Sequence, residues 1–255
     1  MTAGPPADDP WRALRALTDA RIGQPRRGAS LATAAQLAFR QAQAAARDAV
    51  WQAFDAAALA AALGGAALIV DSAAPDRRTY LLRPDLGRRL GEGAAALLAP
   101  HAGDHDLVIV VTEGLSARAV QRHAAPVLDA ALPALRAAGW RLAPLVVVRG
   151  GRVAIGDAVA AALGAGAVAV LIGERPGLSA PDSMGAYVTW RPTPATTDAG
   201  RNCLSNIRPA GLGHAEAARR LVGLLRAMRA SGRSGVGLTA AAPSPALSPP
   251  GNTPG

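Results

Sequence analysis

The stretch Val168-Ala169-Val170-Leu171-Ile172-Gly173-Glu174-Arg175-Pro176-Gly177-Leu178 decides the fold. It opens with an unbroken apolar run, residues 168–172, which is typical of a strand buried on both faces of a parallel sheet. The run stops at Gly173, and a turn marked by Pro176 and Gly177 follows. Ligands of open α/β sheets lie at the carboxyl ends of strands, so Glu174 is a candidate site residue.

Strand and helix patterns alternate from residue 107 onward. Apolar runs predict strands at 107–111, 145–148, 168–172 and 186–190, and helices are expected at 117–138, 157–163 and 215–230. Ser116 is expected to cap the first of these helices, and Pro126 and Pro133 to kink or divide it. The alternation predicts an α/β fold with a mostly parallel, Rossmann-like sheet flanked by helices.

The chain before this region is predicted to be mainly helical. A short helix is expected at 11–20, then a loop rich in Gly and Arg, then a long helix that begins at Ser30 or Thr33 and runs towards Phe54. Leu68 to Val70 could form a short strand. We divide the chain into a disordered N-terminus (1–10), a helical N-terminal region (11–100), an α/β domain (101–238) and a disordered Pro/Ser/Ala tail (239–255).

Composition excludes several classes of protein. Half of the 255 residues are hydrophobic, which is enough for one sizeable core. All 27 basic residues are Arg and the net charge is +9, but the Arg residues are scattered without interleaved aromatics, so no nucleic-acid partner is expected. The longest apolar run, 56–70, is shorter than the roughly 18–20 residues that cross a membrane, so no membrane partner is expected. A single cysteine, Cys203, fits a reducing compartment.

Three turns are predicted to follow the carboxyl ends of strands: 112–116, 149–153 and 173–177. Topology places them along one edge of the sheet. Gly150-Gly151 can bring the backbone and the next helix N-terminus close to an anion, or it can form an ordinary tight turn, and the spacing leaves both interpretations open.

No self-contained catalytic set is visible in the sequence. The four histidines lack a metal-ligand spacing, and Asp104-His105-Asp106 is interpreted as solvated loop charge. Cys203 has no companion cysteine, although Arg201 beside it could lower its pKa. The residues alone therefore predict an α/β sheet whose carboxyl edge can bind a ligand.

A series of short stretches, in their order along residues 11–238, resembles the small (light) subunit family of ethanolamine ammonia-lyase. Each stretch alone is weak, and their number and order make the match specific. They are Leu14-Arg15-Ala16-Leu17-Thr18, Ala20-Arg21-Ile22, Ala46-Arg47-Asp48-Ala49-Val50, Tyr80-Leu81-Leu82-Arg83-Pro84-Asp85-Leu86-Gly87-Arg88-Arg89-Leu90, Gly114-Leu115-Ser116-Ala117, Gly151-Arg152-Val153, Gly173-Glu174-Arg175-Pro176-Gly177-Leu178, Asn202-Cys203-Leu204-Ser205-Asn206-Ile207-Arg208 and Ser234-Gly235-Val236.

The resemblance implies part of a lyase that uses adenosylcobalamin and radical chemistry to convert ethanolamine to acetaldehyde and ammonia in ethanolamine catabolism. In that family the substrate site belongs to the large (heavy) subunit, and the small subunit helps to enclose the cobalamin. Residues 11–100 are then expected to dock to the large subunit in a hetero-oligomer, and residues 101–238 to bind cobalamin. The expected location is the cytoplasm, inside a bacterial microcompartment in hosts that form one.

The resemblance carries cobalamin contacts over to Val153, Glu174 and Cys203. It implies no catalytic residue and no metal ligand in this chain. Glu174 is expected to accept hydrogen bonds from corrin amides or the nucleotide arm, and Val153 to give a backbone or apolar contact. Val153 and Glu174 are expected to follow adjacent strands, and Cys203 to pack as a small side chain in a longer loop after the next strand. Family members usually have Asp where this chain has Glu113.

The resemblance implies that the cobalamin keeps its own benzimidazole on cobalt. The absence of the Asp-x-His-x-x-Gly string, found in enzymes that supply a histidine, agrees with this. Two other functions are compatible with the residues. One is a stand-alone nucleotide or phosphate binder that uses Gly150-Gly151, and the other, a nucleic-acid binder, depends on net charge alone.

Overall fold

The computed structural model describes residues 9–239, which form one six-stranded sheet and a small two-stranded hairpin. The hairpin pairs β1 (Arg26–Arg27) with β2 (Ser30–Leu31). The strand order of the main sheet is β3-β5-β4-β6-β7-β8. Its strands are β3 (Leu68–Asp71), β4 (Val108–Thr112), β5 (Val146–Arg149), β6 (Ala167–Gly173), β7 (Met184–Trp190) and β8 (Asn202–Ile207).

Strands β3, β5, β4 and β6 are parallel, and β7 and β8 continue the sheet antiparallel to β6 and to each other. The predicted mostly parallel α/β sheet is therefore confirmed. The helices are α1 (Arg12–Arg15), α2 (Thr33–Trp51), α3 (Ala56–Ala62), α4 (Arg77–Leu82), α5 (Ala94–Leu98), α6 (Ala117–Ala137), α7 (Ile155–Leu163), α8 (His214–Ser231) and α9 (Val236–Thr239), with 3₁₀ turns η1 (Leu86–Arg88), η2 (Ala99–His101) and η3 (Asp198–Gly200).

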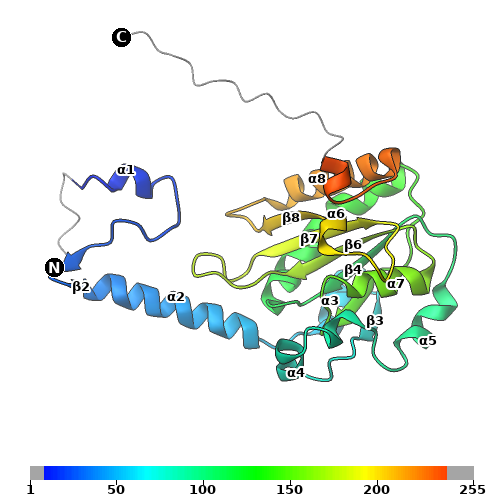
Figure 1. Ribbon diagram of the computed structural model, residues 1–255, viewed down its shortest axis with the longest axis horizontal. Coiled ribbons are helices and arrows are strands. Elements are labelled where there is room, and N and C mark those ends of the chain that lie inside the picture. Colours follow the sequence, from blue (N-terminus) through cyan, green and yellow to red (C-terminus); the bar gives the residue numbers. More distant parts are fainter. Residues whose placement is uncertain (1–8, 240–255) are drawn as a thin grey trace, which may run out of the picture.

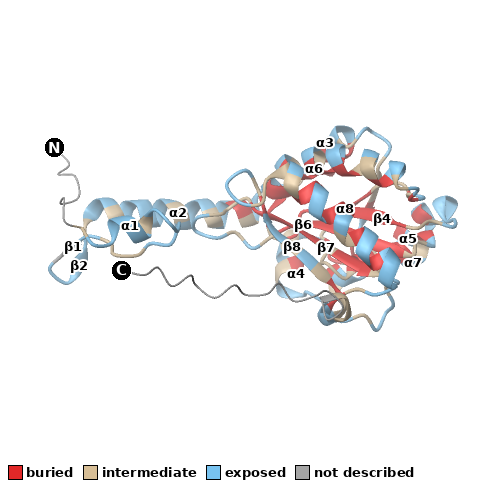
Figure 2. Ribbon diagram, turned by 90° about the horizontal axis from the view of Figure 1, so that it is seen from above, coloured by how far each residue is buried: buried red, intermediate tan, exposed pale blue. Residues whose placement is uncertain are grey.

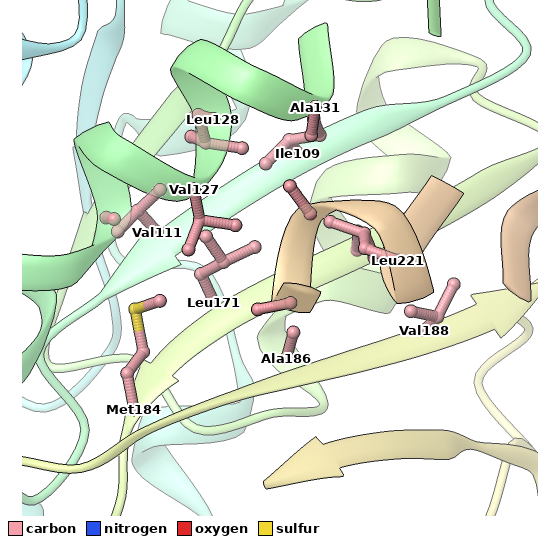
Figure 3. Packing of buried hydrophobic residues seen from close by; sticks show 14 of the residues in the cluster. Ile109, Val111, Val127, Leu128, Ala131, Leu171, Met184, Ala186, Val188 and Leu221 are labelled. Atoms are coloured by element: carbon pink, nitrogen blue, oxygen red, sulfur yellow. The ribbon is translucent and has the colours of Figure 1, made fainter. Parts of the chain in front are cut away.

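Helices cover both faces of the sheet (Figure 1). α3, α6 and α8 pack on one face, and α5 and α7 pack on the other. Alternate residues of each central strand enter opposite cores: Ile109 of β4 faces α6, and its neighbour Val110 faces α7. Figure 3 shows the first core, where Leu171 of β6 and Val188 of β7 lie beneath α6 and α8. Burial of each such side chain contributes about 1.5–3 kcal/mol, which fixes the register of the strands.

The long helix α6 begins as predicted but is not divided. Ser116 Oγ accepts a hydrogen bond from the Ala119 N–H and caps the helix. Pro126 and Pro133 both lie inside the continuous element. The buried face of α6 packs on β4, β6, β7 and α8, and this packing outweighs the hydrogen bonds that the two prolines remove.

An arm formed by residues 9–52 leaves the body of the molecule (Figures 1 and 2). Of the described side chains of α2, Ala49 alone is buried. The expected helix at 11–20 shrinks to the four residues of α1, because α1 buries no side chain and Thr18 Oγ1 accepts the Ala20 N–H instead. Neither Ser30 nor Thr33 caps α2, whose N-cap is Ala32.

The segment between the arm and β4 contains more helices than the sequence predicted. α2 ends at Trp51 because the chain becomes extended at Gln52, and Asp55 then caps a new helix, α3, by accepting the Ala58 N–H. β3 confirms the short strand expected at Leu68 to Val70 and pairs with β5 in the main sheet. Helices α4 and α5 were not predicted, since each is a short segment whose helical state depends on packing against the body.

The chain ends predicted to be disordered fall mostly outside the described residues, since 1–8 and 240–255 are not described. In the described range, no helix combines the length and the apolar character needed to cross a membrane.

Candidate functional site

The three predicted turns meet at the carboxyl edge of the parallel strands. Leu115, Val153 and Glu174, one from each turn, line the same cavity of about 400 Å³. The sequence prediction that these turns share an edge is therefore confirmed. One detail was wrong: Val153 and Glu174 do not follow adjacent strands, because β4 lies between β5 and β6. The full lining is Tyr80, Gly114, Leu115, Arg152, Val153, Ile172, Gly173, Glu174, Arg175 and Tyr187.

Two glycines let the turns after β4 and β6 approach each other. A Cβ on Gly114, whose φ is +52°, would overlap the Gly173 carbonyl oxygen and Ile172 Cγ1. A Cβ on Gly173 would overlap the carbonyl oxygens of Glu113 and Ser116. The Leu115 N–H donates to the Gly173 carbonyl at 2.9 Å across this contact. The floor of the cavity is therefore bare backbone that only glycine permits at these two positions.

Glu174 organises one wall of the cavity. Its Oε2 accepts from Ser183 Oγ at 2.7 Å, and its Oε1 accepts from Ser205 Oγ at 2.7 Å. The Asn206 N–H, oriented by a positive φ of 59°, donates to the same carboxylate. Three donors occupy a group with roughly four acceptor positions, so Glu174 can accept about one further hydrogen bond from a ligand. Gly185 of β7 leaves room for it, since a Cβ there would lie 3.0 Å from Oε1.

Val153 gives the cavity an apolar contact. It is half-buried in the turn between β5 and α7 and packs on the core beneath α7. The turn is held in place because the Arg152 N–H donates to the Gly87 carbonyl at 2.7 Å. The position expected of Val153 at a strand end is thus confirmed, whereas its contact with cobalamin stays a prediction.

Cys203 lies in strand β8 and not in the loop that the sequence predicted. It pairs across the sheet with Tyr187, a lining residue, and shares a face of β8 with Ser205. Cys203 is exposed. Although the residue as a whole is exposed, partial desolvation of its thiol raises the pKa. The Tyr187 side chain acts in the opposite direction, and the nearby Glu174 carboxylate adds to the increase. Burial likewise raises the pKa of Tyr187 to about 12.

The expectation that Arg201 lowers the pKa of Cys203 is wrong. The Arg201 guanidinium is buried and turns away to donate to both carboxylate oxygens of Asp157, at 2.7 and 2.6 Å. This pair joins the segment before β8 to α7. Cys203 therefore lacks the cationic neighbour that a reactive thiolate requires and fits a packing role.

The Gly150-Gly151 turn does not offer a free anion site. The Gly150 N–H donates to Glu113 Oε1 at 2.8 Å, and the Gly151 N–H donates to Thr112 Oγ1 at 3.0 Å. The chain's own groups therefore occupy these two amides, which agrees with the ordinary tight turn and removes the main support for a stand-alone phosphate binder.

Glu113 is the buried carboxylate behind this turn, only 8% exposed. Burial raises its pKa above the ordinary value, while the hydrogen bond from Gly150 and the charge of Arg77 act in the opposite direction. Arg77 donates from Nε to the Val50 carbonyl at 2.8 Å and from Nη1 to the Gly114 carbonyl at 2.6 Å. Arg77 therefore links the end of helix α2 to the turn after β4, which forms the floor of the cavity.

Tyr80 lies between two arginines at the cavity wall. Its side chain is 1% exposed, and its ring centroid lies 4.9 Å from Arg77 Cζ and 4.1 Å from Arg152 Cζ. Arg152 Nη2 also donates to the Tyr80 carbonyl at 2.9 Å. Sequence reasoning missed Tyr80 and Arg152 as site residues, although both belong to stretches that carry the family resemblance.

The remaining polar clusters lie away from the cavity. Asp104 and Asp106 form ion pairs with Arg141, as expected for loop charge. His123 Nδ1 and His214 Nε2 lie 2.9 Å apart between α6 and α8. Residues 9–239 hold no group of three or more side chains placed to bind a metal ion.

Comparisons with known proteins agree on one family. The sequence model of the ethanolamine ammonia-lyase light chain (EutC) matches residues 8–239. The chain is 54% identical over 247 residues to the ethanolamine ammonia-lyase small subunit of Ralstonia nicotianae, covering 94% of this chain and 91% of that protein. It is 52% identical over 258 residues to the small subunit of Azotobacter vinelandii, covering 98% and 96%. The small subunit of Pseudomonas putida is 53% identical over 241 residues, covering 92% and 89%.

Proposed function

Because the chain belongs to the light-chain family of ethanolamine ammonia-lyase and is thus part of a lyase, we propose that its carboxyl-edge cavity covers one side of adenosylcobalamin. The large subunit covers the other side and carries the substrate site. The observation that supports this most is the convergence of Val153 and Glu174 on one open cavity, with Cys203 beside it.

The residues present fit a corrinoid. The bare backbone at Gly114 and Gly173 allows close approach of a flat macrocycle, Val153 offers apolar contact, and Glu174 can still accept from a peripheral amide. Cys203 and Tyr187 extend this wall along β7 and β8. When bound, adenosylcobalamin supplies the radical that begins the reaction, and this chain holds and orients it.

A cavity of about 400 Å³ is far too small to enclose a corrinoid with its nucleotide arm. This size supports a site that is shared between two chains. None of the residues that line the cavity is a histidine, so this wall of the site would offer the cobalt no imidazole.

The arm supplies the docking surface. It leaves the body at the same edge as the cavity, since Arg77 holds the Val50 carbonyl and Ser179, in the loop after β6, donates to the Asp19 carbonyl. Leu37 and Trp51 of α2 are 59% and 58% exposed. A large subunit that binds this apolar face is brought over the cavity, so the two chains form one hetero-oligomer. We place this complex in the cytoplasm, in ethanolamine catabolism.

Cobalamin affinity of the isolated chain and of the complex tests this function. We expect weak cobalamin binding by the chain alone and at least about a hundredfold tighter binding by the complex, because the second half of the site comes from the partner. Equilibrium dialysis of both against hydroxocobalamin measures the difference. Equal affinity in the two states would contradict a shared site.

A further inference from the structure

The cavity carries more positive charge than its own carboxylate balances. Arg152 and Arg175 line it, and neither forms an ion pair with a carboxylate in the described part of the chain. Glu174, the one carboxylate among its lining residues, already accepts hydrogen bonds from Ser183 and Ser205. An anionic group on the ligand would therefore be attracted to this wall.

Arg152 is held in place, unlike an ordinary surface arginine. Its side chain stacks on the ring of Tyr80, Nη2 donates to the Tyr80 carbonyl, and its backbone N–H donates to the Gly87 carbonyl. Gly87 packs so closely that a Cβ there would lie 2.8 Å from Arg152 Cγ. The guanidinium has thus lost its rotamer freedom before any ligand binds, which lowers the entropic cost of a later contact.

Two other arginines that the structure holds in place have carboxylate partners. Arg201 pairs with Asp157, and Arg141 pairs with Asp104 and Asp106. Arg152 is half-buried in the cavity wall with a backbone carbonyl and an aromatic ring as its partners. Partial burial of a cation without a counter-charge costs free energy, and an anionic ligand at this position would recover that cost.

We propose that Arg152 binds the phosphodiester of the cofactor's nucleotide arm. This inference rests on the proposed function. The amides around a corrin ring are neutral, and the phosphodiester is the ionised group that a guanidinium fork recognises best. Arg77, on the same tyrosine ring, adds positive charge behind Arg152 and is a positioning residue, since its Nε and Nη1 donate to the carbonyls of Val50 and Gly114.

The test combines a residue change with a ligand change in the complex with the large subunit. Adenosylcobinamide retains the corrin and its amides but lacks the phosphodiester and the base. In Arg152→Gln we expect the affinity for adenosylcobalamin to fall by about 10- to 100-fold and the affinity for adenosylcobinamide to stay within about twofold. Absorbance titration reads binding directly, without an activity assay.

Arg226→Gln is the matched control, because it removes one positive charge from an exposed position on α8 and should change neither affinity. Arg152→Lys serves if the Gln variant does not fold: it keeps the charge but loses the fork, so a smaller loss confined to adenosylcobalamin is expected. Thermal unfolding of each isolated variant confirms folding.

The other outcomes separate the two proposals. An equal loss for both corrinoids would overturn the phosphodiester contact and leave the cofactor-binding function intact. Loss of large-subunit capture by Arg152→Gln would also overturn it, because Arg152 would then be an ion-pair partner between subunits. Failure of the unaltered complex to bind either corrinoid would instead refute the proposed function.

Discussion

At the scale of single residues, Glu174 is the side chain whose removal separates cofactor binding from folding. Glu174→Ala removes an acceptor from the cavity wall and releases the hydroxyls of Ser183 and Ser205. We expect about tenfold weaker cobalamin retention by the complex and a loss of about 1 kcal/mol in the free energy of unfolding. Asp129→Ala, at an exposed position on α6, is the control and should change neither quantity.

Spectroscopic cobalamin titration and urea unfolding measure the two effects. Unchanged cobalamin affinity in Glu174→Ala would remove this residue from the site.

Glu113 predicts a pH dependence of stability. Burial raises its pKa from the ordinary 4.5, so the folded chain keeps a proton over a pH range in which the unfolded chain has lost it. The stability from this proton is present below about pH 4.5 and is lost as pH rises through the raised pKa. The difference in unfolding free energy between wild type and Glu113→Gln should therefore fall above that pH and then level off.

Urea unfolding of both proteins across the acid and neutral range checks this behaviour. A difference that is flat, or that grows with pH, would mean that Glu113 is not desolvated in the folded chain.

The sequence predicted part of this residue-level description. Val153 and Glu174 were placed at strand ends because the apolar runs before them identify β5 and β6. The stack of Arg152 on Tyr80 could not be predicted, because it requires α4 to fold beside the turn after β5, more than 70 positions away in the chain. Contacts of this kind depend on tertiary packing and leave no local pattern.

At the scale of elements, the contact between the turns after β4 and β6 depends on Gly114. Gly114→Ala places a Cβ on the Gly173 carbonyl in a left-handed conformation, so we expect destabilisation by at least about 2 kcal/mol. Gly223→Ala is the matched control: Gly223 lies in α8 with open space around its Cα. That change should stabilise the chain by about 0.5–1 kcal/mol, because alanine loses less backbone entropy in a helix.

Thermal unfolding of the two variants compares them directly. Equal stability of Gly114→Ala and wild type would show that the turn can move away from β6, which would contradict a rigid cavity floor.

The elements differ in how far sequence predicts them. Strands β4, β5 and β6 are buried on both faces, so they can be recognised in the sequence as continuous apolar runs. β8 is an edge strand with polar residues such as Asn202 and Ser205 exposed or half-buried, so its pattern resembles a loop. α6 tolerates two prolines that local rules treat as breaks, because its packing face is long. Sequence therefore predicts the centre of this sheet better than its margins.

At the scale of the whole molecule, the arm and the cavity should be functionally separate. Leu37→Glu places a charge on the exposed face of α2, where it cannot disturb a core, because Leu37 is 59% exposed. We expect weaker capture of the large subunit and an unchanged melting temperature of the isolated chain. Leu97→Glu, at a 60% exposed position on α5, is the control and should leave capture intact.

Pull-down of the large subunit through a tag on this chain measures the effect. Full capture by Leu37→Glu together with loss by Leu97→Glu would move the docking surface from the arm to the body.

The most direct test of the central claim is co-expression of this chain with the large subunit of ethanolamine ammonia-lyase, followed by purification through a tag on this chain. Acetaldehyde formation from ethanolamine is then measured with and without adenosylcobalamin. The account predicts that the two chains purify together and that activity requires both chains and the cofactor. Two folded chains that do not purify together and show no activity would contradict it.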